Sequence, residues 1–245
     1  CTFGTKLAIF SGTGSSSGSI SWDSTSDKFL VVIGYESTTS SGDQTAGYVV
    51  SDSGTTLSKG TRVVLGTTAS RWGELAYDPD NNKHLFTYRD NNDGGKCGAA
   101  VLTVSGTSVS TGTRVASASA DIDAAVPAYI TGGKFVVQFN KGQESYARVV
   151  SVSGTTPSFG AESSKIDDVT SESGYQYNLS TVYDEGIGKV MCGIRINSGA
   201  AVFRALTIDT SANTITAIGS STAIGTNSKS FGHYYYKDKM MHIFG

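Results

Sequence analysis

Short apolar runs alternate along the whole chain with turns rich in Gly, Asp, Asn and Ser. In the runs KFLVVIGY, from Lys28, and KFVVQF, from Lys134, apolar residues occupy successive positions. That pattern predicts β-strands covered on both faces, since a strand with one wet face would alternate. Each run follows a lysine that closes a polar turn, and this lysine recurs every 50 to 55 residues, at Lys28, Lys83, Lys134, Lys189 and Lys239.

A second phrase repeats in step with the lysines. Residues 50–61 read VSDSGTTLSKGT, residues 104–113 read VSGTSVSTGT, and residues 152–160 read VSGTTPSFG. A period of about 50 residues with several short strands per copy is typical of a propeller blade. The sequence therefore predicts an all-β, five-bladed β-propeller forming a single domain over residues 1–245, with blades at 19–71, 72–122, 123–174 and 175–230 and a closing blade made of 231–245 plus 1–12. A β-solenoid and a pair of β-sandwiches fit the spacing less well.

The two ends of the sequence supply parts of one repeat. Residues 3–9, FGTKLAI, align with KGTRVVL at 59–65, a fourth strand, whereas residues 234–244 give a first and a second strand. Sharing a blade between the chain ends closes many propellers. The third strand of that blade is missing, and we expect a longer parent chain to supply it; a three-stranded blade or a strand donated by a neighbouring subunit are the alternatives.

Composition narrows the function classes. Charged residues make up 16% of the chain and the net charge is -2, so no strong field attracts nucleic acid or an anionic membrane. No apolar stretch approaches the roughly 20 residues that span a bilayer. The 30 glycines, with many Ser and Thr residues, are typical of extracellular or virion-surface β proteins, which is the location we expect.

The usual carriers of catalysis and metal binding are sparse. We expect Cys97 and Cys192 to be buried thiols too far apart to bridge, and His84 to be a packing histidine. The GxSxG pattern at 14–18 lies in a Ser/Gly-rich run that we interpret as a loop, and Asp78, Asp80 and Asn82 fit a hairpin turn better than a Ca²⁺ loop. We predict no cofactor, no metal site and no catalytic residue.

Aromatic residues and blade-specific loops are the better candidates for binding. Trp22, Tyr77, Tyr129, Tyr183 and Tyr235 occupy equivalent positions before the turn, and we interpret them as core packing, with sugar stacking as the alternative. The loops at 36–44, 90–96 and 140–144 differ between blades, and varied loops on a regular scaffold commonly bind ligands. The candidate ligand-binding residues are Asp90, Asn91, Asn92, Asp93, Asn140, Gln143 and Glu144.

The units YDPDNNKHLFTYRD and AAVLTVSGTSVSTGTRV resemble a repeat of fibre-like and tail-associated proteins of tailed phages. The resemblance implies a non-enzymatic structural or host-attachment module of a virion surface, whose partners are other virion proteins or a cell-surface glycan. It implies no catalytic residue. A secreted multivalent lectin is the alternative, a glycan-processing hydrolase is a third hypothesis, and a homo-oligomer fits any of them.

Overall fold

The computed structural model describes residues 4–10, 17–38, 42–66, 70–118, 121–169, 179–196, 200–225, 231–236 and 239–244. These residues form β-strands and turns without a helix, and none of their elements is a helix long and apolar enough to cross a membrane. The all-β prediction is therefore confirmed.

The strands follow the repeat, each copy forming a small antiparallel sheet that we call a blade. The first strands are β1 (Ser17–Asp23), β6 (Ser70–Asp78), β11 (Ile122–Thr131), β16 (Leu179–Asp184) and β21 (Phe231–Tyr236). The second strands all begin at the recurring lysine: β2 (Lys28–Thr38), β7 (Lys83–Asp90), β12 (Lys134–Lys141), β17 (Lys189–Arg195) and β22 (Lys239–Phe244). The third strands are β3 (Gly42–Ser53), β8 (Lys96–Ser105), β13 (Glu144–Ser153) and β18 (Ala201–Asp209).

The outer strands are broken rather than continuous. We expected one fourth strand at 61–65 and another at 113–116. The structure instead has two short pieces in each of four blades: β4 (Thr56–Lys59) and β5 (Val63–Gly66), β9 (Ser108–Thr111) and β10 (Val115–Ala116), β14 (Thr156–Glu162) and β15 (Asp167–Asp168), and β19 (Thr214–Ile218) and β20 (Thr222–Gly225). In the first blade the break falls at Gly60, where the chain leaves the ladder to pass the turn of the next blade.

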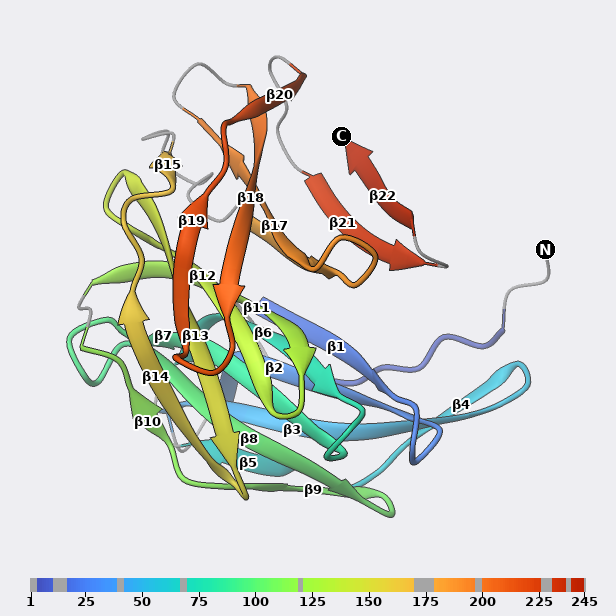
Figure 1. The fold of residues 1–245 in the computed structure, drawn as a ribbon. Helices are drawn as coiled ribbons and strands as arrows, with labels where there is room; N and C mark the ends of the chain where they lie inside the picture. The colour runs from blue at the N-terminus through green and yellow to red at the C-terminus, as the bar shows by residue number, and fades with distance from the viewer. Residues whose placement is uncertain are drawn as a thin grey trace.

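Consecutive blades lie side by side through their first strands. β6 pairs with β11 in parallel at Gly73 and Ala125, and β1 packs beside β6, β11 beside β16, and β16 beside β21. This succession of sheets can be followed by colour in Figure 1. It is the arrangement of a propeller, while the count of five blades and the shared closing blade stay predictions.

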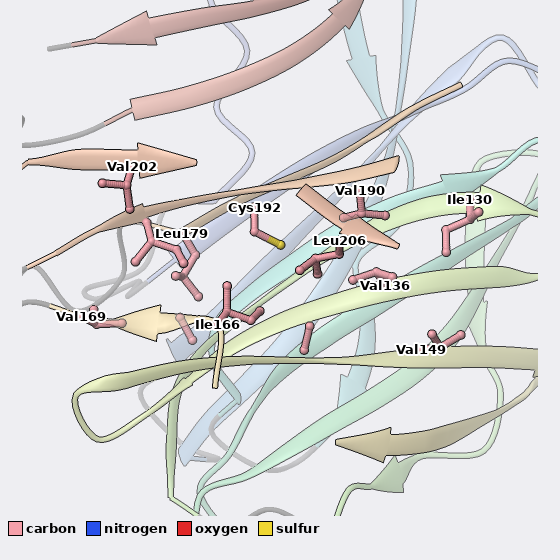
Figure 2. Close-up of a cluster of buried hydrophobic side chains, with 13 residues drawn as sticks. Ile130, Val136, Val149, Ile166, Val169, Leu179, Val190, Cys192, Val202 and Leu206 are labelled. Atoms are coloured by element: carbon pink, nitrogen blue, oxygen red, sulfur yellow. The ribbon is translucent and has the colours of Figure 1, made fainter. Parts of the chain in front are cut away.

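The core lies between the blades, as the continuous apolar runs predict. One cluster, drawn in Figure 2, joins Val136 and Val149 of the third blade to Val190 and Leu206 of the fourth. Two further clusters fill the boundaries between the first and second blades and between the second and third. Both buried cysteines are free thiols, as expected, and burial raises the pKa of Cys97 to about 12.

Two of the repeated aromatics link adjacent blades. The Tyr77 hydroxyl donates to Asp23 Oδ1 at 2.9 Å, and the Tyr129 hydroxyl donates to Asp80, so each tyrosine reaches the turn of the preceding blade. Trp22 packs on Phe29 with 4.6 Å between ring centroids. These contacts agree with a packing role. Tyr235 lies on β21, whose side chains are outside the described part of the structure.

Candidate functional site

A charged cluster lies where β7 ends and β11 begins. Arg89 places Nη2 2.9 Å from Asp121 Oδ1 and donates from Nε to the Ile122 carbonyl oxygen at 2.6 Å. Its Nη1 donates to Asn91. One guanidinium therefore ties the β7–β8 turn of the second blade to the start of the third blade. We call Trp72, Arg89, Asn91, Asp121 and Asp123 the mouth cluster.

Local backbone geometry places Trp72 and Asp121 in this cluster. Trp72 and Asp121 have φ angles of 50° and 55°, where non-glycine residues are uncommon, and a register shift in the β6–β7 pairing falls at the same point as Trp72. The Trp72 ring lies 6.0 Å from Arg89 Cζ. Gly73 follows because a Cβ there would lie 2.4 Å from the Phe86 ring. An aromatic face, a guanidinium and an amide thus converge beside two carboxylates.

The two carboxylates differ in environment. Asp121 is exposed and paired with Arg89. Asp123 is half-buried, and its pKa is raised, first by burial and then by the charge of Asp121, while Arg89 opposes the shift. A raised pKa next to a specific charge partner is the mark of a candidate acid–base group.

A third carboxyl on the neighbouring inner strand is perturbed in the same direction. The Glu74 side chain reaches solvent, yet protein atoms surround it on most sides, and this desolvation raises its pKa. The Ser19 hydroxyl donates to Glu74 Oε2 at 2.7 Å and partly opposes the shift. Glu74 therefore joins β1 to β6 and is a second candidate for proton transfer.

Of the residues predicted in the β7–β8 loop, only Asn91 belongs to the mouth cluster. Asp90 is buried, with Oδ2 2.7 Å from Arg114 Nη2 and Oδ1 accepting the Asn92 N–H, so it braces the loop. Asp93 pairs with Lys96 at 2.8 Å. The loop prediction thus found the right turn, although most of its acids hold the turn itself.

The other predicted loop serves its own blade. Asn140 is fully buried, and the Gln143 carbonyl oxygen accepts the Val169 N–H at 2.7 Å. Glu144 accepts the Tyr146 hydroxyl and lies 3.6 Å from Lys165. These contacts hold the segment that follows β14, and no printed contact of theirs reaches the mouth cluster. Our residue list missed Trp72, Arg89, Asp121 and Asp123, for which the only sequence signal was the Asp-Ile-Asp spacing before an inner strand.

A second hollow, of about 600 Å³, lies between the segment 164–168 and β19. Its charges are neutralised within the protein, with Arg204 Nη2 2.8 Å from Asp167 and Lys165 Nζ 2.9 Å from Asp168. No group of three metal-ligating side chains occurs in the part of the chain that the structure describes. Asp78, considered for Ca²⁺, accepts the backbone N–H groups of Asp80 and Asn81, as turn aspartates do.

Solved structures with this arrangement of sheets include three hydrolases. A putative 6-phosphogluconolactonase from Bacteroides uniformis aligns with a TM-score of 0.54 at 9% identity, over 92% of this chain and 57% of that chain. A Hadza microbial sialidase gives 0.55 at 11% identity, over 88% and 47%, and a Trypanosoma rangeli sialidase gives 0.52 at 14% identity, over 93% and 43%. The chain thus spans about half the length of the structures it resembles. No protein-family model matches the sequence, and no curated protein is significantly similar to it.

These neighbours contradict our expectation of a non-enzymatic virion module, and the prediction that the protein is not an enzyme was wrong. The folds most like this one are named as sialidases and a putative lactonase, which are hydrolases. The physical reason for the error is that a repeat defines a scaffold, whereas a catalytic site is built from residues that break the repeat. At 9 to 14% identity the likeness itself shows the fold, and the activity is taken up below as a proposal. The resemblance to phage repeats and the extracellular location stay predictions.

Proposed function

We propose that this protein hydrolyses glycosidic bonds at the mouth cluster. The observation that carries the proposal is the pair Asp121 and Asp123, two carboxyl groups on one strand start in unequal environments. Hydrolysis of a glycosidic bond commonly uses one carboxyl that is protonated and one that is ionised. Environments that push two titratable groups apart supply that division of roles.

Asp123 is the general acid of this proposal. Its raised pKa keeps a proton available at a higher pH than an ordinary aspartate does, so it can protonate the leaving-group oxygen. Asp121, which faces solvent and is held by Arg89, presents the carboxylate that activates a water or stabilises the positive charge developing on the sugar ring.

The remaining members of the cluster suit a sugar. Trp72 offers an aromatic surface for a sugar face, and Asn91 and Arg89 offer polar groups for its hydroxyls or for an acidic substituent. The sialidase names among the fold neighbours make acidic sugars the first substrates to try.

The test is turnover of a panel of chromogenic glycosides, with aryl sialosides first and neutral aryl glycosides beside them. We expect Asp123→Asn to lower kcat by about 100-fold or more, the range typical of a lost general acid. Asp52→Asn, which alters an exposed aspartate on β3, is the matched control and should keep full activity.

Two outcomes would overturn the proposal. One is turnover that Asp123→Asn and Asp121→Asn leave unchanged. The other is saturable binding of glycans on an array with no hydrolysis of any glycoside in the panel, which would describe a lectin.

A further inference from the structure

A glycine contact recurs along the outer rim at each successive pair of blades. The glycine that ends the first outer segment of one blade lies directly under the turn after the third strand of the next blade. A Cβ at these glycines would approach the turn carbonyl oxygen to 2.2 Å (Gly4 and Thr55), 1.9 Å (Gly60 and Thr107), 2.1 Å (Gly112 and Thr155) and 2.2 Å (Gly160 and Asn213). We call each such glycine a turn seat, and only glycine fits beneath an occupied one.

Gly219 is the turn seat of the fourth blade. Its N–H donates to the Ala205 carbonyl oxygen at 2.8 Å, as the Gly60 N–H donates to Val49 and the Gly112 N–H to Val101, both at 2.8 Å. Its carbonyl oxygen accepts Arg204 Nη1 at 3.0 Å, as that of Gly160 accepts Arg148 Nη1 at 2.8 Å. The backbone of Gly219 is therefore built like the four seats before it.

No turn covers Gly219 among the residues that the structure describes. A Cβ added there would meet only atoms of Ala205, the nearest being its carbonyl oxygen at 3.2 Å. The seat is thus formed on one side and open on the other.

The sheet that follows the fourth blade explains which element fits there. β21 packs beside β16, and β22 pairs with β21 alone within the described residues, whereas the second strand of each earlier blade also pairs with a third strand. Figure 1 shows this two-stranded sheet beside β17, near the carboxy-terminal end. In the earlier blades the third strand pairs with the second and ends in the turn that covers the seat of the preceding blade. A strand added to the free edge of β22 in the same way would end over Gly219.

We propose that the free edge of β22 and Gly219 together bind an extended segment of another polypeptide that has the character of this protein's own third strands. Backbone hydrogen bonds to β22 supply the affinity, as in other strand additions to a sheet edge. The seat supplies the specificity, because it accepts only a turn that begins immediately after the strand.

The sequence of the bound segment follows from the observed turns. Two third strands end in Val-Ser-Gly-Thr, at 104–107 and 152–155, and the turn glycines Gly54, Gly106 and Gly154 have φ angles of 69°, 59° and 61°. A glycine at that position lets the turn adopt a left-handed conformation at little cost. The partner segment is therefore an apolar strand of about ten residues closed by Ser-Gly-Thr.

The test uses a synthetic peptide that copies residues 144–155, ESYARVVSVSGT, against the whole protein. We expect saturable binding by calorimetry and a rise in the thermal midpoint with peptide concentration. A peptide with Gly154→Val should bind at least about tenfold more weakly, a loss of about 1.4 kcal/mol.

The matched receptor variant is Gly219→Val, with Gly219→Ala as the milder form if valine disturbs folding. Both should weaken peptide binding while circular dichroism and the thermal midpoint of the free protein stay close to those of the parent, because the seat is open. Absence of binding at saturating peptide, or equal affinity of parent and variant, would overturn the proposal. So would a dimer of the protein alone that is lost in Gly219→Ala, since the occupant would then be a second copy.

Discussion

The outer rim and the mouth cluster of the same blades differ in one respect that separates scaffold from function. At the rim, a glycine under a turn recurs from blade to blade with nearly the same geometry. At the mouth, Arg89, Asp121 and Asp123 occur at one blade boundary only, and nothing equivalent repeats. Repeated contacts are those that any blade needs in order to pack on the next. Contacts that break the repeat have no such structural reason, and chemistry is better sought there.

The largest effect should come from filling an occupied turn seat. In Gly112→Ala the new Cβ would lie 2.1 Å from the Thr155 carbonyl oxygen, and we expect the free energy of unfolding to fall by about 4 kcal/mol because backbone must move. Urea denaturation measures the loss. Gly219→Ala is the control and should cost about 1 kcal/mol or less; equal losses would remove the distinction between occupied and open seats.

The next effect comes from a residue that breaks the repeat inside the scaffold. His84 follows the recurring lysine where Phe29 and Phe135 stand in other blades, and its Nε2 lies 3.7 Å from Asp23 Oδ2 with both side chains fully buried. Burial lowers the pKa of His84 to about 4, against the attraction of Asp23. The folded protein thus keeps His84 neutral while the unfolded chain takes up a proton below about pH 6.5, so stability is present above pH 6.5 and is lost towards pH 4, on the order of 3 kcal/mol.

Replacing His84 with Phe, the residue of the neighbouring repeats, should remove this loss. Unfolding free energies at pH 7 and pH 4.5 for the parent and His84→Phe measure it as a difference. The lowered pKa of Asp80 and the raised pKa values of Glu74 and Asp123 contribute equally to both proteins and cancel. An unchanged pH dependence in the variant would show that His84 is not the titrating group.

A smaller effect is expected for a buried polar contact between the third and fourth blades. The Thr181 hydroxyl donates to Gln138 Oε1 at 2.9 Å, and the Gln138 side chain is fully buried. Thr181→Val leaves that oxygen without its donor and should cost about 1 to 2 kcal/mol in unfolding free energy. Thr181→Ser keeps the hydroxyl and should cost less than the valine variant; the reverse order would show that packing, and not the hydrogen bond, dominates.

The smallest effect on stability, with a large one on activity, is expected at the mouth cluster. Arg89 pairs with an exposed carboxylate, so Arg89→Lys should change the unfolding free energy by less than about 1 kcal/mol. Lysine cannot reproduce the forked contacts to Asp121, Asn91 and the Ile122 carbonyl oxygen, and we expect turnover of the best glycoside to fall by about tenfold. A variant with lost stability and intact turnover would assign Arg89 to the scaffold.

Much of the scaffold could be predicted from local patterns. Each second strand begins at the recurring lysine, and the continuous apolar runs lie between two sheets, because strand period and burial are written into neighbouring residues. The break in the outer strands was missed, since it depends on the turn of the next blade, about 50 residues further along the chain.

The mouth cluster shows the limit most clearly. Asn91 was expected from its loop, but Arg89, at the end of an apolar strand, gave no signal of its own. Its partners Asp121 and Ile122 stand more than 30 residues away and are brought to it only when β6 and β11 pair in parallel. The order of blades and the residues that pack within each one follow from the sequence by itself, because they depend on short-range periodicity. Which carboxylates meet an arginine, and which turn seat stays open, was decided by the tertiary structure, because contacts between blades join positions that no local pattern connects.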